Sequence, residues 1–388
     1  MILLYFLIWR LFDFIIIFFS QKIIPYLGFF PYANQLPLFH LPTWVSSLAN
    51  FDGLHYISIA HNGYAQYEQA FFPLYPMLIK FLSPLFSNNQ LLTGLIISNI
   101  SFLIGLIIFY KYLFLIRATT RVAPTVIFLL LAFPTSFFFG AVYTEGLFFL
   151  LLISTLYFLK KERYFLVMVF AFLASLTRLV GVFLIIPIIF HLIEQERATT
   201  RVAPTTNFNK FQRISILFAP ILGLASYCFY LWRTTGDPLF FLTSQPIFGA
   251  NRSTHLILLP QVYYRYFKIF ITAAHDSRFY VSLVEFTVFS FVLLILILDL
   301  IKLACASKNL KIKNWERISL SIFSFVNLIL PTLTGTFSSI PRYALFSVSF
   351  FIFLAEIKNN IVKFSIAIIF LILHILLLGY FTQGYFIS

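Results

Sequence analysis

Residues 1–20 read MILLYFLIWRLFDFIIIFFS, an apolar run that is long enough to cross a bilayer as a helix. The run lacks a small-residue cleavage site and contains Arg10 and Asp13. It is therefore predicted to be a retained first helix and not a removable signal peptide. Because the two charged residues lie three positions apart, they can pair on one face of this helix.

Apolar runs of similar length recur from one end of the 388-residue chain to the other. Hydrophobic residues make up 61% of the chain and charged residues only 10%, whereas a soluble domain carries about a quarter charged residues. The fold class is therefore predicted to be an all-α integral membrane protein, a polytopic bundle of about eleven transmembrane helices. The expected spans are 1–20, 90–111, 124–142, 146–160, 164–177, 179–194, 214–232, 281–302, 318–335, 343–356 and 364–384.

Residues 1–388 are expected to form a single multi-pass membrane domain. Two long outer loops, 21–89 and 233–280, hold too many polar groups to lie in lipid, and their amphipathic and aromatic stretches predict helices on the membrane surface. Three consecutive spans within 146–194 are short for a crossing, so one pair of them can instead be a re-entrant or tilted element.

The formal net charge of +14 is concentrated on one side of the predicted topology. Most of the 27 lysines and arginines fall in the loops on the side of the N-terminus, which the positive-inside rule assigns to the cytoplasm. Attraction to anionic membrane lipids explains this charge, so nucleic acid is not expected as a partner. The two cysteines, Cys228 and Cys305, offer no disulfide framework or metal cluster.

One nonapeptide, RATTRVAPT, occurs twice, at 117–125 and at 197–205, with unrelated flanking residues. An isolated match of this kind is not typical of a duplicated structural unit. Two interpretations stay open: a basic patch that contacts lipid, or an inserted repetitive element that loops tolerate.

Carboxylates and guanidinium groups are predicted to meet at the outer ends of the spans. Asp52 leads into a polar turn, Glu145 lies at the outer end of two adjacent helices, and Arg178 and Arg342 should reach the same level. Ionisable groups beside spans are candidates for function because an unpaired charge is costly in lipid. Such a cavity suits a reaction in which a carboxylate takes a proton from an attacking hydroxyl while arginines neutralise a leaving phosphate.

Five motifs occur in order along the chain: FDGLHYISIAHNGY with FFPLYPML (51–64 and 71–78), FPTSFFFGAVYTEGLFFLLL (133–152), ASLTRLVGV (174–182), GDPLFFLTSQ (236–245) and LPTLTGTFSSIPRYAL (330–345). Together they resemble the signature of the PIG-V family, the GPI mannosyltransferase II family and its prokaryotic relatives within the GT-C superfamily. The resemblance implies an inverting membrane glycosyltransferase that uses a polyprenyl-phosphate sugar donor, typically mannose. It further implies that Asp52 acts as a base or lies beside a metal.

Two departures from the family pattern bear on the acceptor. Phe51 stands where the family has Trp, which keeps an aromatic platform but loses the indole donor. The chain is also shorter than eukaryotic members. A prokaryotic relative is therefore expected, in a bacterial or archaeal plasma membrane, with the endoplasmic reticulum membrane as the eukaryotic alternative. The acceptor is expected to be a lipid-linked or cell-surface glycan or a glycolipid on the outer or luminal face, and membrane lipids are further partners.

The candidate catalytic residues are Asp52, His55 and Glu145, and the candidate substrate-binding residues are Lys80, Arg178, Arg342, Tyr56, Tyr143 and Asp237. Several of them have a plainer interpretation. Asp52 and Asp237 can be helix or turn caps, His55 can be a structural histidine, and Glu145 can simply pair with Arg178. Tyr56 can belong to an interfacial aromatic belt.

Whether the protein needs a divalent cation stays open at this point. The chain has no paired DxD aspartates, and Asp52 with Glu145 would be a sparse site for Mg²⁺ or Mn²⁺, to be completed by donor phosphate and water. The alternative to an enzyme is a transporter or flippase of lipid-linked sugars, which would also need a cationic cavity. Such a protein should show inverted-repeat symmetry, and the sequence shows none.

Overall fold

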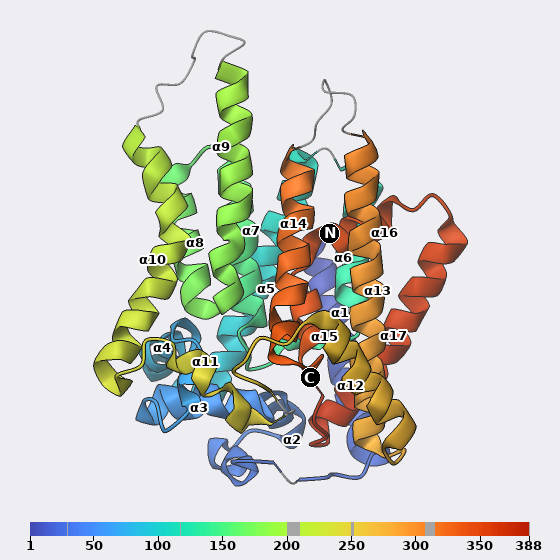
Figure 1. The fold of residues 1–388 in the computed structure, drawn as a ribbon. Coiled ribbons are helices and arrows are strands. Elements are labelled where there is room, and N and C mark those ends of the chain that lie inside the picture. The colour runs from blue at the N-terminus through green and yellow to red at the C-terminus, as the bar shows by residue number, and fades with distance from the viewer. Residues whose placement is uncertain (29, 117, 200–209, 250–251, 307–314, 388) are drawn as a thin grey trace.

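The computed structural model describes the chain except residues 29, 117, 200–209, 250–251, 307–314 and 388. The described residues form helices and no strands (Figure 1), which confirms the predicted all-α class. The α-helices are α1 Ile2–Ile23, α2 Thr43–Ser46, α3 Asp52–Asn62, α4 Leu74–Leu82, α5 Gln90–Leu115, α6 Val122–Ala132, α7 Glu145–Lys160, α8 Tyr164–Thr177, α9 Ile185–Thr199, α10 Lys210–Thr235, α11 Phe240–Thr243, α12 Leu259–Thr272, α13 Ser277–Ala306, α14 Trp315–Ile329, α15 Ile340–Ala344, α16 Val348–Glu356 and α17 Asn360–Thr382.

Seven described helical segments are long and apolar enough to cross a membrane. They are Ile2–Ile23, Gln90–Leu115, Leu179–Arg197, Arg213–Thr235, Ser277–Cys305, Trp315–Thr334 and Asn360–Thr382. The count of about eleven crossings stays a prediction, because the other expected spans are shorter helices. The expected span 124–142, for example, ends as α6 at Ala132, since Pro134 disfavours helical backbone at the residue before it. The chain then continues as the 3₁₀ helix η5 Ser136–Gly140.

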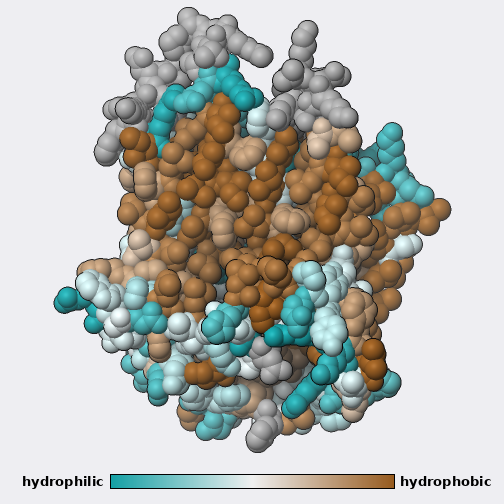
Figure 2. All heavy atoms as spheres, in the orientation of Figure 1, coloured by the Kyte–Doolittle hydropathy of each residue, from teal (hydrophilic) through white to brown (hydrophobic). Residues whose placement is uncertain are grey.

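The two ends of the bundle differ in construction. Figure 1 shows long helices such as α10, α13 and α14 running in roughly one direction, with the short helices α2, α3, α4, α11 and α12 gathered at one end. These short helices come from the two predicted outer loops. In Figure 2 a hydrophobic band covers the long helices, and hydrophilic residues are frequent over the short ones. The short helices therefore lie at one end of the hydrophobic band, and their contact with a membrane surface stays a prediction.

A buried ion pair ties one face of α1 to the bundle. Arg10 donates from Nη1 to Asp13 Oδ2 at 2.9 Å, which confirms the pairing expected from their spacing. The other oxygen of Asp13 lies 2.8 Å from His374 Nε2 on α17, and His374 Nδ1 lies 3.1 Å from Ser136 Oγ on η5. Each charged or polar group in this buried network has a partner, as burial in an apolar interior requires.

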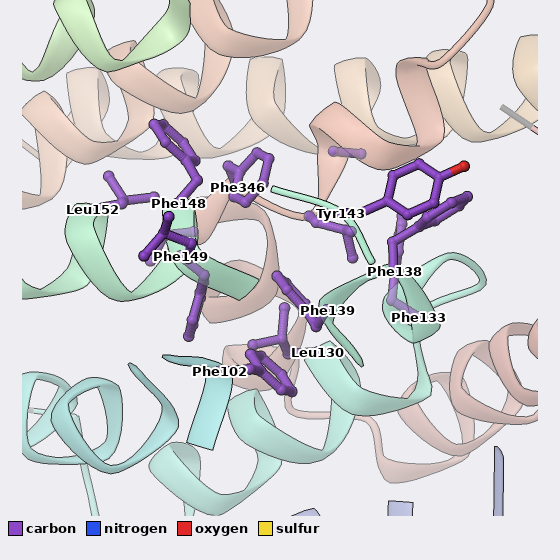
Figure 3. Packing of buried hydrophobic residues seen from close by; sticks show 14 of the residues in the cluster. Phe102, Leu130, Phe133, Phe138, Phe139, Tyr143, Phe148, Phe149, Leu152 and Phe346 are labelled. Atoms are coloured by element: carbon purple, nitrogen blue, oxygen red, sulfur yellow. The ribbon is translucent and has the colours of Figure 1, made fainter. Parts of the chain in front are cut away.

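Aromatic packing supports the segment between η5 and α7. The rings of Phe102 and Phe139 stack with centroids 4.1 Å apart, and Phe149 packs against both (Figure 3). Behind them α7 approaches α5 closely at Gly146, where a Cβ atom would lie 2.5 Å from the carbonyl oxygen of Ser98. The start of α7, including Glu145, is thus held against a rigid core.

Replacing Gly146 with Ala should destabilise the fold by about 1–3 kcal/mol, because the added methyl group overpacks the α5–α7 contact. The change would be measured as a lower melting temperature of the purified protein in detergent. Ile100→Ala, at an exposed position of α5, is the control. A Gly146→Ala protein as stable as the wild type would contradict this packing.

Candidate active site

A cavity of about 910 Å³ opens among the short helices. This volume is within the range of small-molecule sites. Its walls come from α3, the 3₁₀ helix η3 Glu68–Ala70, the junction of α8 with the 3₁₀ helix η6 Leu179–Leu184, the segment before α12, and the turn before α15. The ionisable side chains on its surface include Asp52, His55, Tyr56, Glu68, Arg178, Arg252 and Arg342.

Asp52 is placed by a strained turn that is tied down on both sides. Phe51, directly before α3, has φ 59° and ψ −115°, a conformation that a bulky residue rarely adopts without support. The support is visible one residue earlier: Tyr143 donates from its hydroxyl to Asn50 O at 2.8 Å, and Asn50 Nδ2 donates to Phe381 O at 2.9 Å. Asp52 then begins α3, where the helix dipole favours a negative charge.

Arg342 forms an ion pair with Asp52 across 290 positions of sequence. Its Nη1 donates to Asp52 Oδ2 at 2.8 Å, and its guanidinium also lies over the ring of Phe138. Burial alone would raise the pKa of Asp52, but the charge and hydrogen bond of Arg342, with smaller effects of His55 and Arg252, lower it below its ordinary value. Asp52 is therefore ionised at neutral pH.

Two guanidinium groups converge on one hydroxyl. Arg342 Nη2 and Arg252 Nη2 lie 3.1 Å and 3.3 Å from Ser339 Oγ, and Ser339 itself has a positive φ of 68°. The other hydrogen bond of Arg252 goes to Gln245 Oε1 at 3.3 Å, so its hydrogen-bond partners in the described part of the chain are neutral. Arg342 Nε is buried and has no hydrogen-bond partner among the described residues. Like charges held this close favour an anion between them.

Arg178 and Glu145 form a second ion pair, with Arg178 Nη1 donating to Glu145 Oε1 at 2.6 Å and to Thr144 Oγ1 at 3.1 Å. The guanidinium also lies over the ring of Tyr343, 4.5 Å from its centroid. Arg178 lines the cavity, whereas Glu145 is fully buried behind it. The plainer interpretation of Glu145, pairing with Arg178, matches this contact.

His55 and Glu68 form a third polar pair, which also lines the cavity. His55 Nδ1 lies 3.0 Å from Glu68 Oε1, and Glu68 Oε2 accepts a hydrogen bond from the backbone N–H of Ala65 at 3.0 Å. Glu68 was missed as a candidate, although it lies in the polar stretch that carries Asp52. Arg252 and Ser339 were missed as well, since nothing in their spacing relates them to the other candidates.

The remaining four candidates differ in their position relative to the cavity. Tyr56 lines the cavity, and burial together with Asp52 raises its pKa. Tyr143 is buried and acts through Asn50. Lys80, on α4, and Asp237 do not line the cavity. Asp237 accepts hydrogen bonds from the N–H of Leu239 and from Thr243 Oγ1, both at 2.8 Å, which is the turn-capping geometry.

The surroundings of the carboxylates bear on the question of a divalent cation. Among the described residues no group of three His, Cys, Asp or Glu side chains could hold a metal ion. Asp52 and Glu145, the two carboxylates considered for Mg²⁺ or Mn²⁺, are each bonded to a guanidinium. A cation at either carboxylate would have to displace that arginine or lie beside its positive charge.

Comparison with known proteins yields one family. The family model described as Mannosyltransferase (PIG-V) matches residues 2–236, which is more than half of the chain. The match includes Asp52, His55, Glu68, Glu145 and Arg178, while Arg252 and Arg342 lie beyond it. No curated protein and no solved structure matches the chain.

Proposed function

Because the chain belongs to the Mannosyltransferase (PIG-V) family and is a membrane glycosyltransferase, we propose that it transfers mannose from a polyprenyl phosphate to a glycan or glycolipid hydroxyl. The observation that carries this proposal is the meeting of Arg252, Arg342 and Asp52 in one cavity. A phosphate-binding corner directly beside an ionised carboxylate is what displacement of a lipid phosphate by a hydroxyl requires.

The donor phosphate binds between Arg252 and Arg342, with Ser339 Oγ as a third donor. A phosphodiester carries one negative charge, and this corner has two guanidinium groups against the single carboxylate of Asp52. As the bond from the sugar carbon to the phosphate oxygen breaks, a second negative charge develops on the phosphate. The two arginines stabilise that charge, which lowers the barrier to transfer.

The acceptor hydroxyl approaches from the side of Asp52. Its oxygen forms a bond to the anomeric carbon of the mannosyl group while the bond to phosphate breaks, and its proton passes to a group in the cavity. Asp52 accepts the hydrogen bond of the hydroxyl and directs its attack, and the candidates for the final proton acceptor are Asp52 and His55. A single displacement of this kind inverts the β-linked donor to an α-linked product.

We further propose that the cavity faces the outside of a plasma membrane, or the lumen in a eukaryotic host. The support comes from the distribution of charge, because the loops at the other end of the predicted topology carry most of the lysines and arginines. A lipid-phosphate donor suits this face, since no soluble nucleotide donor is needed there.

The donor class can be tested with purified protein in detergent. Labelled mannose would be offered as polyprenyl-phosphate mannose or as a nucleotide-diphosphate mannose, with a host lipid and glycan extract as the acceptor pool. We expect label in a glycan or glycolipid product only with the polyprenyl phosphate. Transfer from the nucleotide sugar alone would contradict the proposal.

Transfer should not depend on added divalent cations. We expect activity in excess EDTA within about twofold of the activity with Mg²⁺ or Mn²⁺, because guanidinium groups already occupy the carboxylates a cation would need. The measurement is initial rate against chelator concentration, with a Mg²⁺ add-back as the control. Loss of transfer that Mg²⁺ or Mn²⁺ restores would show that a cation takes part.

A further inference from the structure

We infer that Glu68 is a positioning residue that holds His55 as the final acceptor of the proton released by the attacking hydroxyl. This inference deepens the proposed transfer reaction and rests on it. It assigns the proton to His55 rather than to Asp52, which the sequence alone favours as the base.

The imidazole of His55 is fixed from several sides. Its Nδ1 atom lies 3.0 Å from Glu68 Oε1, and the ring stacks on Phe71 with centroids 5.0 Å apart. Tyr32 and Phe248 meet the ring edge to face, at 5.2 Å and 5.6 Å. Glu68 is itself held, since it is only 2% exposed and its second oxygen accepts the N–H of Ala65. The ring therefore has one orientation with respect to the cavity.

That orientation sets the tautomer of the ring. An ionised carboxylate only accepts hydrogen bonds, so Nδ1 carries the hydrogen and Nε2 keeps the lone pair. His55 lines the cavity, so Nε2 is the nitrogen free to take a proton. Once the imidazole is protonated, the charge of Glu68 stabilises the imidazolium.

Asp52 is the poorer proton acceptor of the two. Its carboxylate is already bonded to Arg342, and the charge of that arginine holds the pKa of Asp52 below its ordinary value. It can accept a hydrogen bond from the hydroxyl, but it takes up a proton only at acid pH. In the balanced step, the hydroxyl proton goes to His55 Nε2, the oxygen bonds to the anomeric carbon, and the electron pair of the broken bond leaves with the phosphate.

Several charged groups around His55 act on the imidazolium that would form during transfer. Glu68 on η3 and Asp52 on the same helix favour the imidazolium, whereas Arg252 and Arg342 in the same cavity oppose it. Tyr32 is the titratable ring in edge contact with His55, and His255 is a further titratable group on the cavity surface. Loss of the Glu68 charge should therefore remove a contact that stabilises the imidazolium formed during transfer.

The test compares the pH dependence of kcat/KM for polyprenyl-phosphate mannose in the wild type, Glu68→Gln and His55→Asn. The wild-type rate should fall on the acid side of the profile, where the group that accepts the proton becomes protonated. Glu68→Gln should lower kcat by about 10- to 100-fold with little change in KM, and should move the acid limb to lower pH, because the carboxylate no longer stabilises the imidazolium. His55→Asn should lower kcat at least as much and lose that limb. His61→Asn, an exposed histidine on the same helix, is the matched control and should behave as wild type.

Size-exclusion profiles and melting temperatures of each variant separate a loss of fold from a loss of chemistry. If Glu68→Gln keeps the wild-type acid limb and only yields less folded protein, Glu68 is merely structural and the inference is wrong. If His55→Asn keeps the wild-type kcat and limb, the inference is also wrong while the proposed function stands. Absence of transfer by the wild type would overturn the proposed function, and this inference with it.

Discussion

Replacing Asp52 with Asn should lower mannosyl transfer by about 10²- to 10⁴-fold at neutral pH. Asparagine keeps the shape of the side chain but removes the negative charge that directs the acceptor hydroxyl. It also leaves the guanidinium of Arg342 without its carboxylate partner. Because that guanidinium is buried, the variant should melt at a lower temperature as well.

A second variant separates these two effects of Asp52→Asn. The double change Asp52→Asn with Arg342→Gln removes both charges of the ion pair, so the melting temperature should return toward the wild-type value. Transfer should stay low, because the groups that act on the substrates are still missing. Asp276→Asn, an exposed aspartate at the start of α13, controls for loss of a carboxylate elsewhere. Recovery of transfer in the double variant would show that Asp52 acts only on the fold.

The ion pair should also be insensitive to pH over the working range. The pKa of Asp52 is lower in the folded protein than its ordinary value of about 3.9. The ion pair therefore stabilises the fold fully at any pH above that ordinary value. This stabilisation is lost as the pH falls through the lower pKa of the folded state. A loss of activity between pH 5 and 7 therefore has to come from a group other than this ion pair.

Replacing Arg342 with Gln should lower kcat/KM for the lipid-phosphate donor by about 10²- to 10³-fold. The loss should appear in both KM and kcat. KM should rise because the bound donor phosphate loses a cation. kcat should fall because the second charge that develops on the phosphate is no longer stabilised. Arg342→Lys should retain part of the activity, since it keeps the charge but not the two-pronged geometry of the guanidinium.

Arg252 provides an independent check of the same corner. Arg252→Gln removes a cation whose hydrogen-bond partners in the described structure are neutral, so its effect on the fold should be small and its effect on donor KM large. Arg278→Gln, exposed at the same end of the molecule, is the control for net charge. Unchanged donor KM in both Arg252→Gln and Arg342→Gln would place the phosphate elsewhere in the cavity.

The sequence was sufficient for features that depend on local spacing or on the cost of charge in lipid. The apolar runs predicted the all-α membrane class, and a spacing of three predicted the pairing of Arg10 with Asp13. The rule that charge beside a span needs a partner predicted that Glu145 and Arg178 reach the same level, where they bond.

Features that depend on long-range packing could not be read from the sequence. Arg252 lies in a segment without helical period, and only the fold brings it to the hydroxyl of Ser339. Lys80 and Asp237 lie in the predicted outer loops, but sequence spacing does not say which face of a short helix or turn meets the cavity. Their predicted roles in substrate binding stay predictions, and the structure places neither at the cavity surface.

The first copy of the RATTRVAPT repeat shows a different limit. Its last four residues form the first turn of α6, where Pro124 needs no backbone hydrogen-bond donor. The identical letters of the second copy lie largely outside the described residues. The described part of the first copy thus forms helix only where it joins the apolar run that follows it. A role of the repeat in lipid contact stays a prediction.

The most direct test of the proposed chemistry is single-turnover transfer of labelled mannose from polyprenyl-phosphate mannose in proteoliposomes, with movement of the lipid across the membrane followed in the same vesicles. We predict that the wild type forms labelled glycan or glycolipid and that Asp52→Asn loses at least about 99% of this transfer. Neither protein should change the rate at which the lipid crosses the membrane, compared with vesicles without protein. Transfer that survives in Asp52→Asn, together with movement of the lipid that depends on Asp52, would contradict the enzyme and indicate a transporter of lipid-linked sugars.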